Sequence, residues 1–485
     1  MRHSILYPLV IILSLFLSSC EDFLDQTPST SLPSEDAIQT VDDLRNALNG
    51  AYTRLIDLDG NGHSYYAGDF ICLGDLRSND MTYILNSNAI SPVARLEYSK
   101  NSGLAESFWL THYTVLGRIN NILSATDGVK VEASEDSLYS DLIGQLYGLR
   151  ALLHFDLART FSQLPTALHS GMTMTTPDGG IPLANQKFDV SYKPVRVTLQ
   201  ETYDFIISDL DTAIARMYPG PQKTDTYGSL NLYSVLAIKS RVLLYLGDYT
   251  NSLLAAEYVI SNAGDAGYRL SFIGDYPLMW SGVSQNEYLF ELITNTLYNS
   301  QRNSIGYYST PNGYGEFGCT DTFKNWISTS PFGTDIRASL IVEKVNLNGK
   351  GGLFPDKYPG REGSDYINNP KIIRLAEVYL NAAEAAFKTD NNSKATQYIN
   401  ELRRKRILGY VDVASVTLEE ILDERRKELF AEGHRCWDAW RNQQSLLIAR
   451  FSATPVNYDD YRTLVAIPQR ETDLSPGLKQ NPGYN

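Results

Sequence analysis

A helical alternation of apolar and polar residues is clearest in residues 418–441, LEEILDERRKELFAEGHRCWDAWR. Its apolar residues recur near the helical period of 3.6, which predicts two amphipathic helices that pack into an all-helical core. The charged residues between them are expected on the opposite face of the first helix: Asp423, Arg425, Arg426 and Lys427.

Sequence signals also mark the ends of these two helices. Thr417 and Glu420 have the spacing of a capping box, in which each side chain accepts a hydrogen bond from the other residue's backbone. Gly433 is expected to break the first helix, and Trp437 and Trp440 place two large rings on one side of the second. We therefore expect the second helix to pack in the core.

The same period predicts helices through most of the chain, at residues 34–56, 104–124, 141–161, from 199, and in the pairs 232–246 with 252–260 and 372–388 with 394–406. In the last pair, small side chains allow two antiparallel helices to approach closely: Ala382, Ala383, Ala386 and Ala395. Helix pairs of this kind are typical of tetratricopeptide-like repeats. The fold class is therefore predicted to be all-α.

Residues 264–370 have a different character. They are dense in Gly, Pro, Asn, Ser and aromatic residues, with short apolar runs such as 288–293 that could form strands. Irregular segments of this length inside a compact protein are usually functional. We predict a helical scaffold at 36–263 and 371–485, with 264–370 as a loop-rich insertion over one face.

The N-terminus has the features of a targeting segment. Arg2 precedes an apolar run at 5–17, and the segment closes with Leu-Ser-Ser-Cys at 17–20, which resembles a bacterial lipobox. We predict a signal peptide at 1–19 and a lipidated Cys20 that begins a polar tether at 20–35. Glu21-Asp22 resembles the signal that sends lipoproteins of Bacteroidetes-type bacteria to the outer face of the outer membrane. The alternative is an ordinary signal peptide with an incidental cysteine.

Composition narrows the class of ligand. The 485 residues are 43% hydrophobic and 20% charged, which is ordinary for a folded soluble domain. The formal net charge of −14 argues against binding to nucleic acid, which needs clustered Lys and Arg. Tyrosine is unusually frequent, at 32 residues against 17 Phe, and suits binding surfaces because it joins a stacking face to a polar edge.

Motifs for catalysis or metal binding are weak. The chain has no H-E-x-x-H, G-x-S-x-G, C-x-x-C or Walker loop, and its G-x-G-x-x-G at 313–318 follows no buried strand. Asp57, Asp59 and Asn61 match the first half of a calcium loop, but Gly68 stands where its bidentate Glu should be. We predict no catalytic residue, cofactor or metal. A glycoside hydrolase stays open, because it needs only two well-placed carboxylates.

The remaining histidines and cysteines are interpreted as structural. His154 and His434 lie in predicted helices, where packed side chains are commoner than catalysts. The cysteine spacing fits neither a disulfide framework nor a zinc site, and we expect no disulfide among Cys20, Cys72, Cys319 and Cys436.

Two loop clusters combine aromatic rings with amides, the groups that stack on sugar C–H faces and bond hydroxyls. The predicted ligand-binding residues are Tyr65, Tyr66 and Tyr83 in the first cluster, which also holds His63, Asp69 and Asn86, and Tyr307, Tyr308, Asn312, Tyr314 and Phe317 in the second, which also holds Asn303. Glycines in the second cluster would let the rings splay toward solvent. The alternative is that these tyrosines only attach loops to the scaffold.

The order of these pieces resembles the SusD/RagB family of outer-membrane nutrient-binding lipoproteins. The resemblance spans nearly the whole chain and lies in Cys20 and in residues 147–165, 194–210, 246–249, 373–384, 424–441, 466–470 and 481–484. Residues 60–100 and 264–365 follow no family pattern, and ligand contacts in this family lie in such variable loops.

The resemblance implies an all-helical SusD-like fold with four tetratricopeptide-like helix pairs and a loop-rich binding lobe. It also implies a partner, a SusC-like TonB-dependent transporter that the lipid-anchored protein caps at the cell surface. The ligand would be an oligosaccharide or, as in the RagB branch, a peptide. A pure interaction module, with a peptide in the groove of the helices, is a further alternative.

Overall fold

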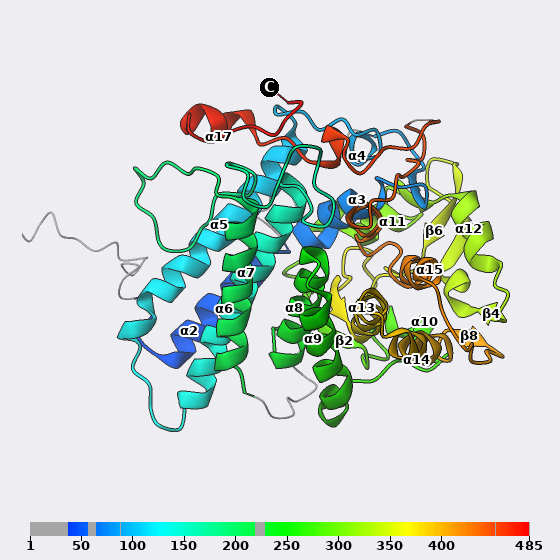
Figure 1. The fold of residues 1–485 in the computed structure, drawn as a ribbon, viewed down its shortest axis with the longest axis horizontal. Coiled ribbons are helices and arrows are strands. Elements are labelled where there is room, and N and C mark those ends of the chain that lie inside the picture. Colours follow the sequence, from blue (N-terminus) through cyan, green and yellow to red (C-terminus); the bar gives the residue numbers. More distant parts are fainter. Residues whose placement is uncertain (1–36, 57–64, 88, 219–227, 452, 485) are drawn as a thin grey trace, which may run out of the picture.

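The computed structural model describes residues 37–56, 65–87, 89–218, 228–451 and 453–484. The predicted signal peptide, Cys20 and the tether lie outside these residues, as do Asp57, Asp59, Asn61 and His63. Helices dominate the described part of the chain, and the labelled strands lie in the right-hand half of the view, with β2 near the middle and β4, β6 and β8 farther out (Figure 1).

The predicted helices are confirmed. They are α2 (Val41–Arg54), α5 (Gly103–Ala125), α6 (Asp136–Phe161), α7 (Leu199–Arg216), α8 (Leu232–Leu246), α9 (Tyr249–Asn262), α13 (Leu375–Lys388), α14 (Asn392–Arg403), α15 (Leu418–Glu428) and α16 (Arg435–Arg441). Two of these helices begin later than predicted. The first helix begins at Val41, because Thr40 caps it by accepting a hydrogen bond from Asp43. Ile372 lies in a strand, β7 (Lys371–Arg374), because it pairs with β2 rather than extending α13.

The helices pack as consecutive pairs, α6 with α7, α8 with α9, and α13 with α14. The predicted alanines Ala382, Ala383 and Ala386 of α13 are fully buried, as is Ala395 of α14. Their short side chains let α13 lie close to both α14 and α9. Gly247 ends α8 in the left-handed conformation, at a φ of 85°, so that the chain can reverse into α9.

Residues 264–370 contain short helices and strands as well as loops. These are α10 (Tyr276–Met279), β2 (Tyr288–Glu291), η4 (Gln301–Asn303), α11 (Ile305–Ser309), β3 (Phe317–Cys319), α12 (Asp321–Ser328), β4 (Thr334–Asp335), η5 (Ile336–Leu340), β5 (Ile341–Val345) and β6 (Gly351–Pro355). The predicted strand at 288–293 is therefore confirmed over Tyr288–Glu291.

Each described sheet takes a strand from outside residues 264–370. The four-stranded antiparallel sheet has the order β1-β3-β6-β5 and begins with β1 (Met81–Tyr83). β2 pairs with β7, and β4 pairs with β8 (Ile407–Leu408). Strand pairing therefore joins the loop-rich segment to the rest of the chain at three places.

Helix α15 differs from its prediction. Its capping box is present, since Thr417 accepts from the Glu420 N–H at 3.2 Å and Glu420 accepts from the Thr417 N–H at 2.8 Å. However, Arg425 and Lys427, two of the four residues predicted on the charged face, are buried, so this face also packs in the interior. Arg425 is buried because carboxylate and amide oxygens surround it: its guanidinium donates to Asp438 and Asn381, each at 2.7 Å.

A buried carboxylate at the end of α15 is the centre of a larger ion network. Glu428 is fully buried and contacts the guanidinium groups of Arg406 at 3.0 Å, Arg374 at 3.1 Å and Arg337 at 3.3 Å. Burial alone would raise the pKa of Glu428, but the three guanidinium charges hold it below its ordinary value. We call these four residues the Glu428 network.

The Glu428 network joins the helical scaffold to the loop-rich segment. Arg337 comes from η5, Arg374 from β7 and Arg406 from the turn after α14. Arg374 and Arg406 also contact Glu287, just before β2, at 3.1 and 2.6 Å. One carboxylate therefore connects four segments that are distant in sequence.

The Glu428→Gln substitution is expected to lower the free energy of unfolding by about 3–5 kcal/mol at neutral pH, because the amide removes a buried negative charge that three buried guanidinium groups share. The measurement is urea unfolding followed by circular dichroism. Glu419→Gln, on an exposed position of the same helix, is the matched control and should leave the unfolding midpoint unchanged.

The same substitution should alter the dependence of stability on pH. Because the pKa of Glu428 is lowered in the folded state, its ionisation stabilises the protein above the unfolded-state pKa of about 4.3. That stability is lost as pH falls through the lower folded-state value. The difference between wild type and Glu428→Gln should therefore shrink below about pH 4. A difference that stays constant from pH 7 to pH 3 would contradict the ion-pair account.

Candidate functional site

The fold brings the two predicted loop clusters together. Strands β1 and β3 pair antiparallel, which sets Tyr83 opposite Phe317 and Met81 opposite Cys319. The π-helix η1 (Tyr65–Asp69) packs against α11, where Tyr307 and Tyr308 lie. The two clusters, which lie more than 200 positions apart in sequence, therefore meet in the fold. Together they form one region of the surface and the buried side chains directly beneath it.

Four of the predicted ligand-binding rings lie in the interior. Tyr66, Tyr83, Tyr308 and Phe317 are buried. The expectation that the rings of the second cluster splay toward solvent is therefore wrong for Tyr308 and Phe317. Tyr66 donates a hydrogen bond to Asp156 of α6, and Phe317 belongs to an inner strand of the four-stranded sheet. Their burial reflects strand pairing and a long-range hydrogen bond, which loop composition does not reveal.

Three tyrosine rings remain at the surface, and the ring of Tyr307 contacts the other two. Tyr307 lies 4.8 Å from Tyr314 and 5.0 Å from Tyr366, measured between ring centroids, and all three are half-buried. We call them the tyrosine platform. Asn312 is exposed at the turn between Tyr307 and Tyr314. No sequence signal links Tyr366 to this cluster, because it lies in a separate turn more than 50 residues downstream.

Local geometry fixes the platform. Ser304 caps α11 by accepting a hydrogen bond from the Tyr307 N–H at 3.2 Å, and the Tyr314 N–H donates to the Tyr307 carbonyl at 2.9 Å. A glycine is required at 313, because an added Cβ would lie 2.5 Å from the Tyr307 carbonyl oxygen. The rings are therefore held on a short, closed turn.

Polar groups border the rings. Tyr366 interacts with the exposed Arg302, and this hydrogen bond raises the pKa of the guanidinium. Asn346 donates to the Gly315 carbonyl at 3.2 Å and supports the turn from beneath. Half-buried rings beside amide and guanidinium donors suit a ligand with apolar C–H faces and many hydroxyl or carbonyl groups.

Comparison with known proteins now gives the family. A model described as "SusD family" matches residues 348–484, and one described as "Starch-binding associating with outer membrane" matches residues 22–244. A solved structure of a putative sugar binding protein from Bacteroides vulgatus is 30% identical, with a TM-score of 0.83, over 93% of this chain and all of that one. The chain belongs to the SusD family.

Other SusD-family proteins are similar to this chain over part or nearly all of its length. SusD-like protein P38 of Formosa agariphila is 25% identical over 98% of both chains. Starch-binding protein SusD of Bacteroides thetaiotaomicron is 32% identical over 125 residues, 23% of this chain and 21% of that one. A solved SusD superfamily protein from Bacteroides thetaiotaomicron is 28% identical, with a TM-score of 0.81 over 91% of this chain and all of that chain. The resemblance and the all-α fold predicted from sequence are confirmed.

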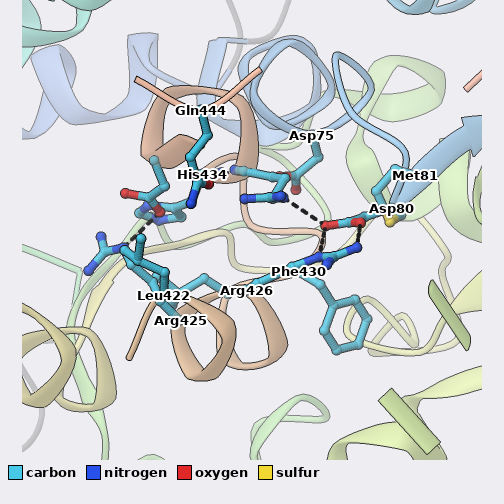
Figure 2. Close-up of a pocket in the computed structure, with 12 residues that line it drawn as sticks. Asp75, Asp80, Met81, Leu422, Arg425, Arg426, Phe430, His434 and Gln444 are labelled. Carbon is cyan, nitrogen blue, oxygen red and sulfur yellow. Dashed lines mark hydrogen bonds and ion pairs between the residues drawn. The ribbon is translucent and has the colours of Figure 1, made fainter. Parts of the chain in front are cut away.

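A small cavity in this SusD-family chain, lined by residues of α15 and α16, is part of the packed interior and not a ligand site (Figure 2). Its volume is about 10 Å³, room for roughly one water molecule. Asp80 is held there by Arg426 at 2.8 Å and Arg435 at 3.0 Å. Burial raises the pKa of Asp75 to about 7, although the backbone N–H groups of Gly433, Arg435 and His434 donate to it. These carboxylates serve the fold and leave no space for a ligand.

The histidines and cysteines also have structural roles. His154 contacts the Arg150 carbonyl at 2.8 Å and accepts from the Ala184 N–H at 3.0 Å, and burial lowers its pKa to about 3. Cys72, Cys319 and Cys436 are buried free thiols. Within the described ranges, no cluster of His, Cys, Asp and Glu could hold a metal ion, and no helix there is long and apolar enough to cross a membrane.

Proposed function

We propose that this SusD-family protein binds neutral oligosaccharides on the tyrosine platform and delivers them to a SusC-like TonB-dependent transporter in the outer membrane. The observation that carries the proposal is the set of three half-buried rings held beside polar side chains. Such rings cover the C–H face of a sugar, while neighbouring amides and the Arg302 guanidinium bond its hydroxyls.

Binding without catalysis agrees with the chemistry around the platform. Glu316 is the carboxylate on the same turn, and its side chain accepts a hydrogen bond from Ser87 at 2.6 Å. Burial raises the pKa of Glu316, and its exposed fraction is 8%. A glycosidase would need two carboxylates that face the bound sugar. We therefore propose a binding protein with no catalytic residue.

An apolar groove on the helical scaffold supports the proposal of a protein partner. It lies across α7, α8 and α9, has a volume of about 390 Å³, and is lined in part by Leu236, Leu254 and Tyr258. Leu254 and Tyr258 are exposed, at 59% and 41%. Exposed apolar surface of this kind is commonly covered by a protein or membrane. In this proposal the helices face the transporter and the loops hold the ligand.

Titration calorimetry of the purified protein against neutral oligosaccharides and a peptide library tests the site. Tyr307→Ala and Tyr314→Ala should each weaken the best oligosaccharide at least tenfold, about 1.4 kcal/mol, without lowering the melting temperature. Tyr308→Ala should instead lower the melting temperature, because Tyr308 is buried.

Tyr218→Ala is the matched control for this titration, because Tyr218 is exposed and lies outside the platform. Unchanged affinity in both Tyr307→Ala and Tyr314→Ala would show that the platform is not the site. Tight binding of peptides with no binding of oligosaccharides would overturn the proposed ligand class.

Anchoring at the cell surface is tested through Cys20. Metabolic labelling with a fatty acid should mark the wild-type protein and miss Cys20→Ser, because lipid is attached through the cysteine sulfur. External protease should digest the wild-type protein on intact cells. Fatty-acid labelling of Cys20→Ser, or resistance of the wild-type protein to the protease, would contradict lipid anchoring at the outer face.

A further inference from the structure

A second cavity lies between α5 and the loop at residues 182–194, with α17 (Gln469–Leu474) at its edge. Its volume is about 440 Å³, within the range of small-molecule sites. Figure 1 places α5 and α17 toward the end of the molecule opposite α12 and β6. The cavity shares no lining residue with the tyrosine platform.

The loop that forms one wall is fixed at several points. Tyr113 donates to the Pro182 carbonyl at 2.8 Å, and Asn120 donates to the carbonyls of Ala184 at 2.9 Å and Gln186 at 3.0 Å. At the far end, Ser475 donates to the Pro194 carbonyl at 2.8 Å. The cavity is therefore preformed, which lowers the entropy lost on binding.

Aromatic and apolar side chains supply its flat walls. Phe188 and Tyr192 stack in parallel, with ring centroids 3.8 Å apart and planes 5° apart. Tyr192 is 41% exposed. The exposed part of its ring adds no hydrophobic stabilisation to the fold, because it stays in contact with water. Trp109 packs against Tyr113 at 4.7 Å on the inner wall. These rings and the cavity between them resemble a site for the C–H face of a ring-shaped ligand.

Four polar side chains that line the cavity are unused by the fold. Those of Thr114, Asn121, Gln186 and Glu471 make no hydrogen bond or ion pair with any residue that the structure describes. They offer a hydroxyl, two amides and a carboxylate, which together donate to and accept from hydroxyl groups. Lys187 also lines the cavity and balances the charge of Glu471, so the wall has no net charge.

We propose that this cavity is a second carbohydrate site, which binds one or two pyranose units of a neutral oligosaccharide. This proposal rests on the proposed function, from which it takes the class of ligand, a neutral oligosaccharide. A peptide fits less well, because the carbonyls of Pro182, Ala184 and Gln186 each already accept one hydrogen bond from Tyr113 or Asn120, which leaves less acceptor capacity for a peptide backbone. Two separate sites on one protein would raise its affinity for long glycans through effective concentration.

The test begins with a variant in which binding at the tyrosine platform is disrupted. The purified full-length Tyr307→Ala/Tyr314→Ala variant is screened against a panel of neutral oligosaccharides by titration calorimetry. At least one oligosaccharide should still bind, and adding Phe188→Ala and Tyr192→Ala should weaken that binding at least tenfold. Gln186→Ala should weaken it without lowering the melting temperature, because this side chain makes no contact that holds the loop. Tyr218→Ala in the same background is the matched control.

The outcomes separate this inference from the proposed function. Oligosaccharide binding that the platform substitutions abolish completely would overturn the second site and leave the proposed function intact. Residual oligosaccharide binding that is unchanged by Phe188→Ala, Tyr192→Ala and Gln186→Ala would also overturn the second site. Failure of the wild-type protein to bind any oligosaccharide would overturn both. Residual binding of peptides alone, lost with Phe188→Ala, would overturn the assigned ligand class.

Discussion

The Glu428 carboxylate is buried among three guanidinium groups, and this burial determines how four segments of the chain meet. Ions that leave water are tolerated only when opposite charges and hydrogen bonds surround them. Arg337, Arg374 and Arg406 each come from a different segment, so satisfying Glu428 requires η5, β7 and the turn after α14 to meet at α15. Apolar contacts alone would specify this arrangement less strictly, because they are not directional.

The candidate binding surface follows from this constraint. Once β7 is fixed by Arg374, strand β2 is fixed beside it, and the segment between β2 and β7 must fold back over the scaffold. The tyrosine platform lies on that segment. Tyr307 and Tyr314 have one side packed against neighbours and the other toward solvent. A rigid base with half-exposed rings is what recognition of a sugar requires, because little freedom remains to be lost on binding.

Periodic features could be predicted from sequence, and features that depend on distant partners could not. The helices and the Thr417–Glu420 capping box were readable because their signals lie within a few residues. The burial of Arg425 was not, since Asn381 is 44 positions away. Tyr308 and Tyr307 are adjacent and equally suitable by composition, yet only one is buried. Tyr366 and the pair Phe188 and Tyr192 carry no local pattern and become visible only when the chain is folded.

Hydrogen exchange of backbone amides, measured with and without the best-binding neutral oligosaccharide, locates the bound ligand on the fold. We expect the ligand to slow exchange in residues 301–316 and around Tyr366, because these amides lie on the turns that carry the platform. Amides of α8 and α9 should exchange at unchanged rates in the absence of the transporter. Slowed exchange along α8 and α9, with no change in residues 301–316, would contradict a ligand site on the tyrosine platform.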